Sequence, residues 1–260
     1  MKFTNGNWLL NKDIEAHYLT QVYDTEICDN YFTIYCPDKP ICDRADTVDG
    51  MLVSVKFSSP MEDIVCVKME HFKGSDTLEP KFDIEDTLNR HMVIKEDDSK
   101  VVLKTGNLSV CINKKEPFII DFMDGEKSIT KTGYKKMAYM KKENDGNYMM
   151  TQLDLGVGEC VYGLGERFTS LVKNGQIIDM WNEDGGTSSE QSYKNIPFYM
   201  TNKGYGVFVN HTGKVSFEVA SERVTKVQFS VPGESLEYYV IYGPSPKAIL
   251  EKYKIGRAHV

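Results

Sequence analysis

The sequence has no long apolar run and no surplus of positive charge. No stretch approaches the roughly 18 to 20 consecutive apolar residues of a membrane span, and its beginning lacks the apolar core of a secretory signal. The net charge is -7, from 31 Lys and Arg against 38 Asp and Glu. Nucleic acid and anionic membranes attract clustered positive charge, so neither is an expected partner.

Metal and cofactor motifs are also lacking. The 6 cysteines include no CxxC pair, and the 5 histidines include no HxxxH spacing. The acidic stretch Glu183–Gln191 lacks the D-x-D-x-D-G ladder of a calcium loop. We therefore expect reduced thiols, no metal, no cofactor and, with no export signal, a cytoplasmic location.

The glycine-rich stretch Leu155–Phe168 departs from G-x-G-x-x-G and has no Gly-Lys-Ser/Thr ending, so it does not predict a phosphate loop. Its glycines are expected instead to allow tight bends and close backbone approach between strands.

Alternation of apolar and polar residues dominates what is present, as is typical of half-buried strands. In "LVSVKF" the side chains of Val53, Val55 and Phe57 fall on one face, and "VVLKTGNLSVCI" reads as a hairpin over 101–112 with a Thr-Gly-Asn turn. The alternation is weaker in the first 50 residues, which are predicted to form either a small lobe or edge strands.

One helix is predicted at the end of the chain. Ser245 and Pro246 suit an N-cap and a first helical position, and "KAILEKY" follows. Many short strands with one terminal helix predict an all-β fold, a large antiparallel β-sandwich in one domain.

The stretch "WNEDGGTSSEQSYKNIPFYM" predicts a long loop before a strand. Loops of this length are uncommon unless they are functional or disordered, and aromatic residues argue against disorder. Trp181, Tyr193 and Tyr199 are candidates for apolar ring faces, and Asn182 and Asp184 for hydrogen-bonding groups. Rings beside carboxylate and amide groups suit a sugar. A loop that only covers the core remains the alternative.

Acidic residues are plentiful, so counting leaves a pair of catalytic carboxylates open. Such a pair must flank one glycosidic bond about 5 to 5.5 Å apart in retaining enzymes, and strand residues of unknown register cannot establish that geometry.

"VYGLGERF", "WNEDGG" and "YKNIPFYMTNKGYGVFVNH", in this order, resemble the N-terminal region of bacterial α-xylosidases of glycoside hydrolase family 31. "NGNWLL" near the start and "LEYYVIYGPSPKAILEKY" near the end resemble that region too, so the similarity extends from Met1 to about Tyr253.

This resemblance implies a galactose-mutarotase-like sandwich that precedes a (β/α)8 barrel. It implies a retaining mechanism on terminal α-xylosyl or α-glucosyl residues of oligosaccharides. The nucleophile and the acid/base are aspartates on the barrel, so no catalytic residue is expected in this chain. In the family an Asn-x-Asp loop contacts the bound sugar, which makes Asp184 the expected contact, with Asn182 and Trp181 as weaker candidates.

Residues 1–254 are accordingly expected to form the sandwich domain, with the barrel absent. The ending "IGRAHV" (255–260) resembles a translated sequencing adapter and is expected to be a non-native tail. Xylose or glucose preference stays open, as does a homo-oligomeric parent. A stand-alone carbohydrate-binding module is the main alternative, and a mutarotase the lesser one, because that chemistry needs a well-placed acid and base.

Overall fold

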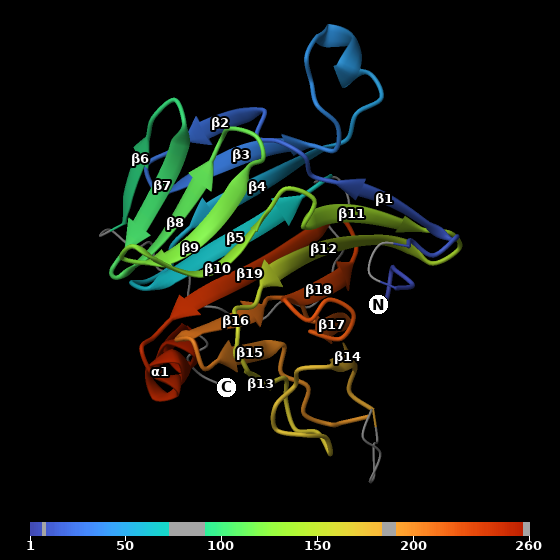
Figure 1. Cartoon of the computed structure of the whole chain (residues 1–260), viewed down its shortest axis with the longest axis vertical. Coiled ribbons are helices and arrows are strands. Elements are labelled where there is room, and N and C mark those ends of the chain that lie inside the picture. The colour runs from blue at the N-terminus through green and yellow to red at the C-terminus, as the bar shows by residue number, and fades with distance from the viewer. Residues whose placement is uncertain (7–8, 73–91, 184–190, 257–260) are drawn as a thin grey trace.

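The structure is a computed structural model, and it describes residues 1–6, 9–72, 92–183 and 191–256. Within these ranges, three antiparallel sheets and one C-terminal helix account for the fold (Figure 1). The predicted all-β sandwich with a short terminal helix is confirmed. Among the described helices, none combines the length and apolar composition that a membrane crossing requires.

The largest sheet has eight strands and includes the second and the last strand of the chain. Its strands, in spatial order, are β13 (Val161–Gly163), β15 (Phe198–Thr201), β16 (Tyr205–Val209), β19 (Ser235–Tyr242), β5 (Ile64–Glu70), β4 (Leu52–Ser58), β3 (Tyr31–Pro37) and β2 (Asp24–Ile27). A short 3-10 helix, η1 (Arg44–Thr47), lies in the connection from β3 to β4.

Two smaller sheets complete the sandwich. The six-stranded sheet contains, in spatial order, β1 (Ile14–Tyr18), β11 (Met137–Lys142), β12 (Gly146–Asp154), β18 (Lys226–Pro232), β17 (Val215–Val219) and β14 (Gln176–Met180). The five-stranded sheet contains β10 (Lys127–Gly133), β9 (Ile119–Asp124), β8 (Leu108–Asn113), β7 (Lys100–Thr105) and β6 (Val93–Glu96). β1 and β2 are edge strands, so the prediction of edge strands in the first 50 residues is confirmed.

A single apolar core joins the three sheets, because one contiguous cluster of buried side chains includes members of all of them. The predicted alternation in β4 is confirmed: Val53, Val55 and Phe57 are buried while Ser54 and Lys56 between them are partly exposed. The predicted hairpin forms as β7 and β8, whose pairing runs from Lys100–Asn113 to Thr105–Leu108.

Helix α1 (Pro246–Gly256) covers the outer face of the eight-stranded sheet, where it lies beside β15, β16 and β19 (Figure 1). The Ser245 hydroxyl accepts from the Ala248 N–H at 3.3 Å, as expected for an N-cap. Ile249 is fully buried there. A Cβ on Gly206 would lie 2.8 Å from Ile249 Cγ2, so glycine allows this close approach.

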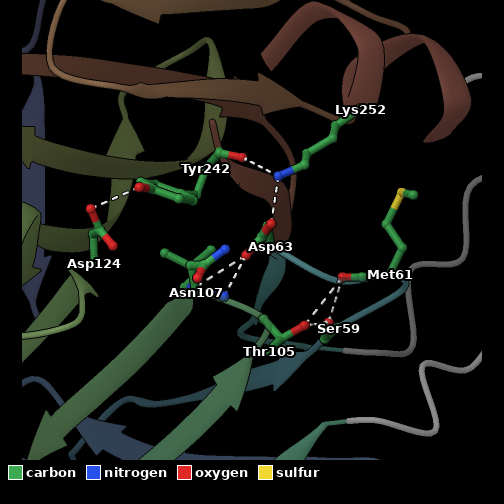
Figure 2. A network of polar contacts seen from close by, with 9 residues as sticks. Ser59, Met61, Asp63, Thr105, Asn107, Asp124, Tyr242 and Lys252 are labelled. Carbon is green, nitrogen blue, oxygen red and sulfur yellow. Dashed lines mark hydrogen bonds and ion pairs between the residues drawn. The ribbon is translucent and has the colours of Figure 1, made fainter. Parts of the chain in front are cut away.

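The carboxylate of Asp63, in the turn between β4 and β5, fastens α1 to the sandwich (Figure 2). One oxygen accepts from Lys252 Nζ at 2.6 Å, and the other accepts from the Asn107 N–H at 2.6 Å. Lys252 also donates to the Tyr242 carbonyl at 2.8 Å, and the Tyr242 hydroxyl donates to Asp124 at 2.7 Å. This junction therefore joins the helix to turns and strands of two sheets.

Burial alone would raise the pKa of Asp63, but the hydrogen bonds from Lys252 and from the Asn107 and Leu108 amides hold that pKa below its usual value. A carboxylate whose pKa is lowered by folding contributes stability above its unfolded pKa, near 4, and loses it as the pH falls through the folded value.

We expect Asp63→Asn to lower the free energy of unfolding by about 1–3 kcal/mol at pH 7, because the Lys252 ammonium loses its buried ionic partner. The difference from the unsubstituted protein should shrink as the pH falls below about 4, where Asp63 of the unfolded chain is protonated, and disappear as the pH passes the lower pKa of the folded state. Urea unfolding at several pH values measures both effects. Asp145→Asn, which removes an exposed carboxylate paired with Lys142, is the control and should change little. A gap that stays constant with pH would contradict the assignment.

Candidate functional site

The candidate site is the loop that follows β14 and precedes β15, at the end of the molecule where β13 and β14 lie (Figure 1). The structure describes its two arms, 181–183 and 191–197. Asp184, the expected sugar contact, lies outside the described residues, so its role stays a prediction.

The two arms are tied to each other by their backbones. Asn182 and Ser192 form an isolated parallel bridge. The Glu183 N–H donates to the Ser192 carbonyl at 3.2 Å, and the Gln191 side-chain amide donates to Glu183 Oε2 at 3.0 Å. The start and the end of the loop therefore lie side by side.

Asn195 is the central side chain of this arrangement. Its Nδ2 lies 2.8 Å from the Trp181 carbonyl, 2.9 Å from Asn182 Oδ1 and 3.0 Å from the Ser192 carbonyl. Its Oδ1 accepts from the guanidinium of Arg167. One side chain thus binds both arms and the preceding segment, a role that no sequence motif indicated.

Arg167 belongs to the glycine-rich stretch and is half-buried. Burial lowers the pKa of its guanidinium, and the nearby Asp179 carboxylate opposes this shift. Arginine keeps its charge in proteins, so the bond to Asn195 is charge-assisted. Its Nε also donates to the Leu164 carbonyl at 3.3 Å, which fixes the guanidinium against the backbone of its own turn.

The glycines of this stretch have the structural role that the sequence predicted. Gly165 has φ +82°, and a Cβ there would collide with the Lys194 carbonyl. Ser192 Oγ donates to the Glu166 carbonyl at 2.6 Å, so the second arm lies directly against this turn. Glu166 also pairs with Lys194 at 3.3 Å, but both side chains are largely exposed and the pair contributes little.

A hollow of about 290 Å³ opens beside the loop. Trp181, Asn182 and Asn195 line one side of it, and the turn His211–Gly213 lines another. The Trp181 ring is 49% exposed, and Lys214 Nζ lies 5.5 Å from its centroid. A tryptophan ring and two amide side chains therefore line the same hollow.

Three of the sequence candidates have different environments. Asn182 is exposed, but its oxygen already accepts from Asn195, so it fixes the loop. Tyr193 is exposed. Tyr199 was a wrong candidate: it is fully buried in the core, and burial raises its pKa. It lies on the inward face of β15 because strand register, invisible in the sequence, turns it away from the loop.

None of the described residues that line the hollow is an Asp or Glu, and glycoside hydrolysis needs two carboxylates that flank the bond. Within the described ranges, no group of three or more His, Cys, Asp and Glu side chains could hold a metal ion.

We expect Asn195→Ala to release the loop arms while leaving the core intact. The substitution removes the contacts to Trp181, Asn182 and Arg167 together. Amide hydrogen exchange in peptides covering 181–183 and 191–197 should become faster, with smaller changes in the sheets. Asn147→Ala is the control. It removes the side-chain amide of a β12 residue that is hydrogen-bonded to Glu234, and it should leave exchange in the loop peptides unchanged. Unchanged loop exchange in Asn195→Ala would refute the role assigned to Asn195.

Comparisons with known proteins agree on the family. Residues 54–218 match the family model of the glycosyl hydrolase 31 N-terminal galactose mutarotase-like domain. The chain is 43% identical over 256 residues to the α-xylosidase XylQ of Lactiplantibacillus pentosus and 39% identical over 273 residues to an α-xylosidase of Emericella nidulans. Each match covers 97% of this chain but only 33% and 35% of the relatives.

A solved structure supports the fold alone. The cycloalternan-forming enzyme of Listeria monocytogenes, in complex with a pentasaccharide substrate, superposes with a TM-score of 0.75 at 18% identity. The match covers 93% of this chain and 22% of that one. The chain thus spans about a third of the length of its curated relatives, and it belongs to the N-terminal galactose mutarotase-like domains of glycoside hydrolase family 31.

Proposed function

We propose that this chain is the N-terminal sandwich domain of a longer, retaining glycosidase that removes terminal α-xylosyl or α-glucosyl residues from oligosaccharides. The observation that carries the proposal is the similarity to two α-xylosidases along 97% of the chain, although the chain spans only a third of either relative. The remaining two thirds have room for a catalytic barrel of about 250 residues.

The loop between β14 and β15 is the proposed contribution of this domain to the sugar site. Asp184 accepts hydrogen bonds from sugar hydroxyls, each worth roughly 1.5–3 kcal/mol for an ionised acceptor. Asn182 and Trp181 hold the first arm in place beside it. The support is the frame of Asn195 and Arg167, which fixes Asn182 and Trp181, two and three residues before Asp184.

Apolar side chains near this loop support a partner that covers it. Phe168, Leu171, Ile177 and Tyr193 are all exposed, and they come from the β13–β14 connection, β14 and the loop itself. Exposed apolar side chains on several segments of one region are a feature of interaction sites. The proposed partner on this surface is the catalytic barrel of the same polypeptide. We further propose that the parent enzyme forms a homo-oligomer.

We also propose that the enzyme is cytoplasmic. All 6 cysteines are free thiols, and Cys36 and Cys66 are buried in strands. Free thiols persist in a reducing compartment.

A stand-alone saccharide-binding module is the second candidate, because the hollow exposes the Trp181 ring beside two amide side chains. In that case a saccharide should change the fluorescence of Trp181 in the isolated chain, an effect that Trp181→Phe would abolish. A spectrum that stays constant at millimolar sugar would count against it.

The activity assay tests the leading proposal. We expect the purified 260-residue chain not to hydrolyse nitrophenyl α-xyloside, since the proposed nucleophile and acid/base lie outside it. The polypeptide encoded by the source gene, read past the codon for Tyr253, should hydrolyse it with retention of anomeric configuration. Turnover that follows the 260-residue chain through two purification steps would contradict the proposal.

A further inference from the structure

A second and larger hollow, of about 470 Å³, lies on the outer face of the six-stranded sheet. Side chains of β11, β12, β17 and β18 form its floor. Its sides are the segment containing Phe3 and Thr4, the β10–β11 turn and the β17–β18 turn. It shares no lining residue with the hollow beside Trp181, so the two are separate sites.

A row of three polar side chains crosses the floor. Gln152 on β12 lies opposite Gln228 on β18, which lies opposite Glu218 on β17. Gln152 Nε2 donates to Gln228 Oε1 at 2.8 Å, and Gln228 Nε2 donates to Glu218 Oε1 at 2.8 Å. Three side chains at consecutive positions across three strands therefore form one hydrogen-bonded chain.

The lysine end fixes the direction of this chain. Lys226 Nζ lies 3.2 Å from Gln152 Oε1, and an ammonium group can only donate. At the other end Glu218 accepts from Gln228, as its ionised form does above the raised pKa of about 7. Each amide is thus held in one orientation and keeps a second N–H and a second carbonyl lone pair for another molecule.

The charges of the hollow are mixed. Lys136 and Lys226 lie 2.5 Å and 3.9 Å from oxygens of Asp154, so both ammonium groups have an acidic neighbour. Glu218 and Glu222 line the same hollow. Burial raises the pKa of Glu218 to about 7, and burial together with Lys136 lowers the pKa of Lys226 to about 8. Both groups therefore lie in a desolvated setting, which strengthens their hydrogen bonds to a neutral partner.

Aromatic groups complete the hollow. Tyr18 lines it from the end of β1, and Tyr134 lines it from the β10–β11 turn with its side chain 43% exposed. Aromatic rings, oriented amides and charged hydrogen-bonding groups are what a sugar ring requires, since its C–H faces pack on rings and its hydroxyls both donate and accept. Lys135 Nζ lies 5.4 Å from the centroid of the Tyr134 ring, so one face of that ring has a cation near it.

We propose that this hollow on the six-stranded sheet is a second saccharide site, which binds a neutral sugar ring of an oligosaccharide. An anion such as phosphate would meet four cations of the lining, Lys135, Lys136, Arg223 and Lys226, but it would also face Glu218 and Glu222, whereas a neutral ring can donate to the acids and accept from the cations. A purely apolar ligand would leave the second N–H and the second carbonyl lone pair of each amide unused. The site makes no use of the loop near Trp181, so it stands or falls separately from the proposed activity.

Side-chain amide resonances of Gln152 and Gln228 test the proposal directly by NMR, once assigned by single substitution. Titration of the 260-residue chain with maltose should shift both pairs of resonances saturably, with a dissociation constant of about 1–10 mM. The Asn195 amide resonances serve as the reporter of the other site. In the expected result, Gln152 and Gln228 shift whether or not Asn195 does.

Tyr134→Ala should weaken maltose binding about three- to tenfold, since it removes an exposed ring without opening the core. Tyr23→Ala, which removes another exposed ring that does not line the hollow, is the matched control and should leave the affinity unchanged. Shifts confined to Asn195, no shift up to about 50 mM maltose, or saturable shifts with inorganic phosphate but none with maltose would each overturn the proposal.

Discussion

The ion pair between Asp63 and Lys252 determines where the end of the described chain sits on the sandwich (Figure 2). Asp63 belongs to a turn of the eight-stranded sheet, and its carboxylate is held by the amides that follow Gly106 in the hairpin of the five-stranded sheet. Lys252 brings α1 onto the same point. Without this pair the helix would keep its apolar contacts and the bond from Lys252 to the Tyr242 carbonyl, and the turns beneath it would lose their shared acceptor.

The position of α1 matters because the helix also contacts the end of the candidate loop. Phe198, the first residue of β15, stacks on Tyr253 of α1 with ring centroids 4.2 Å apart. Pro197, directly before it, lines the hollow beside Trp181. The end of the loop at Pro197 and Phe198 therefore lies beside the last helix, although the two are far apart in sequence. A domain that follows the helix would begin close to the loop that we propose it uses.

Local sequence was sufficient for the local features. Alternation predicted β4, the hairpin of β7 and β8 followed from its Thr-Gly-Asn turn, and Ser245-Pro246 marked the start of α1. Features that depend on strand order were not accessible. Gln152, Gln228 and Glu218 read as ordinary outward polar positions, and only the order β12-β18-β17 makes them a row. The same reason explains the wrong prediction for Tyr199 and the unforeseen role of Asn195, whose partners come from three segments.

The central claim is that the sandwich lends its loop to a sugar site completed by another part of the polypeptide. The most direct measurement is kcat/KM for nitrophenyl α-xyloside in the longer gene product carrying Asp184→Asn, beside the control Glu183→Gln. The account predicts a loss of roughly tenfold or more for Asp184→Asn, the equivalent of about 1.4 kcal/mol or more, and little change for Glu183→Gln. Equal activity of both variants and the unsubstituted enzyme would contradict it.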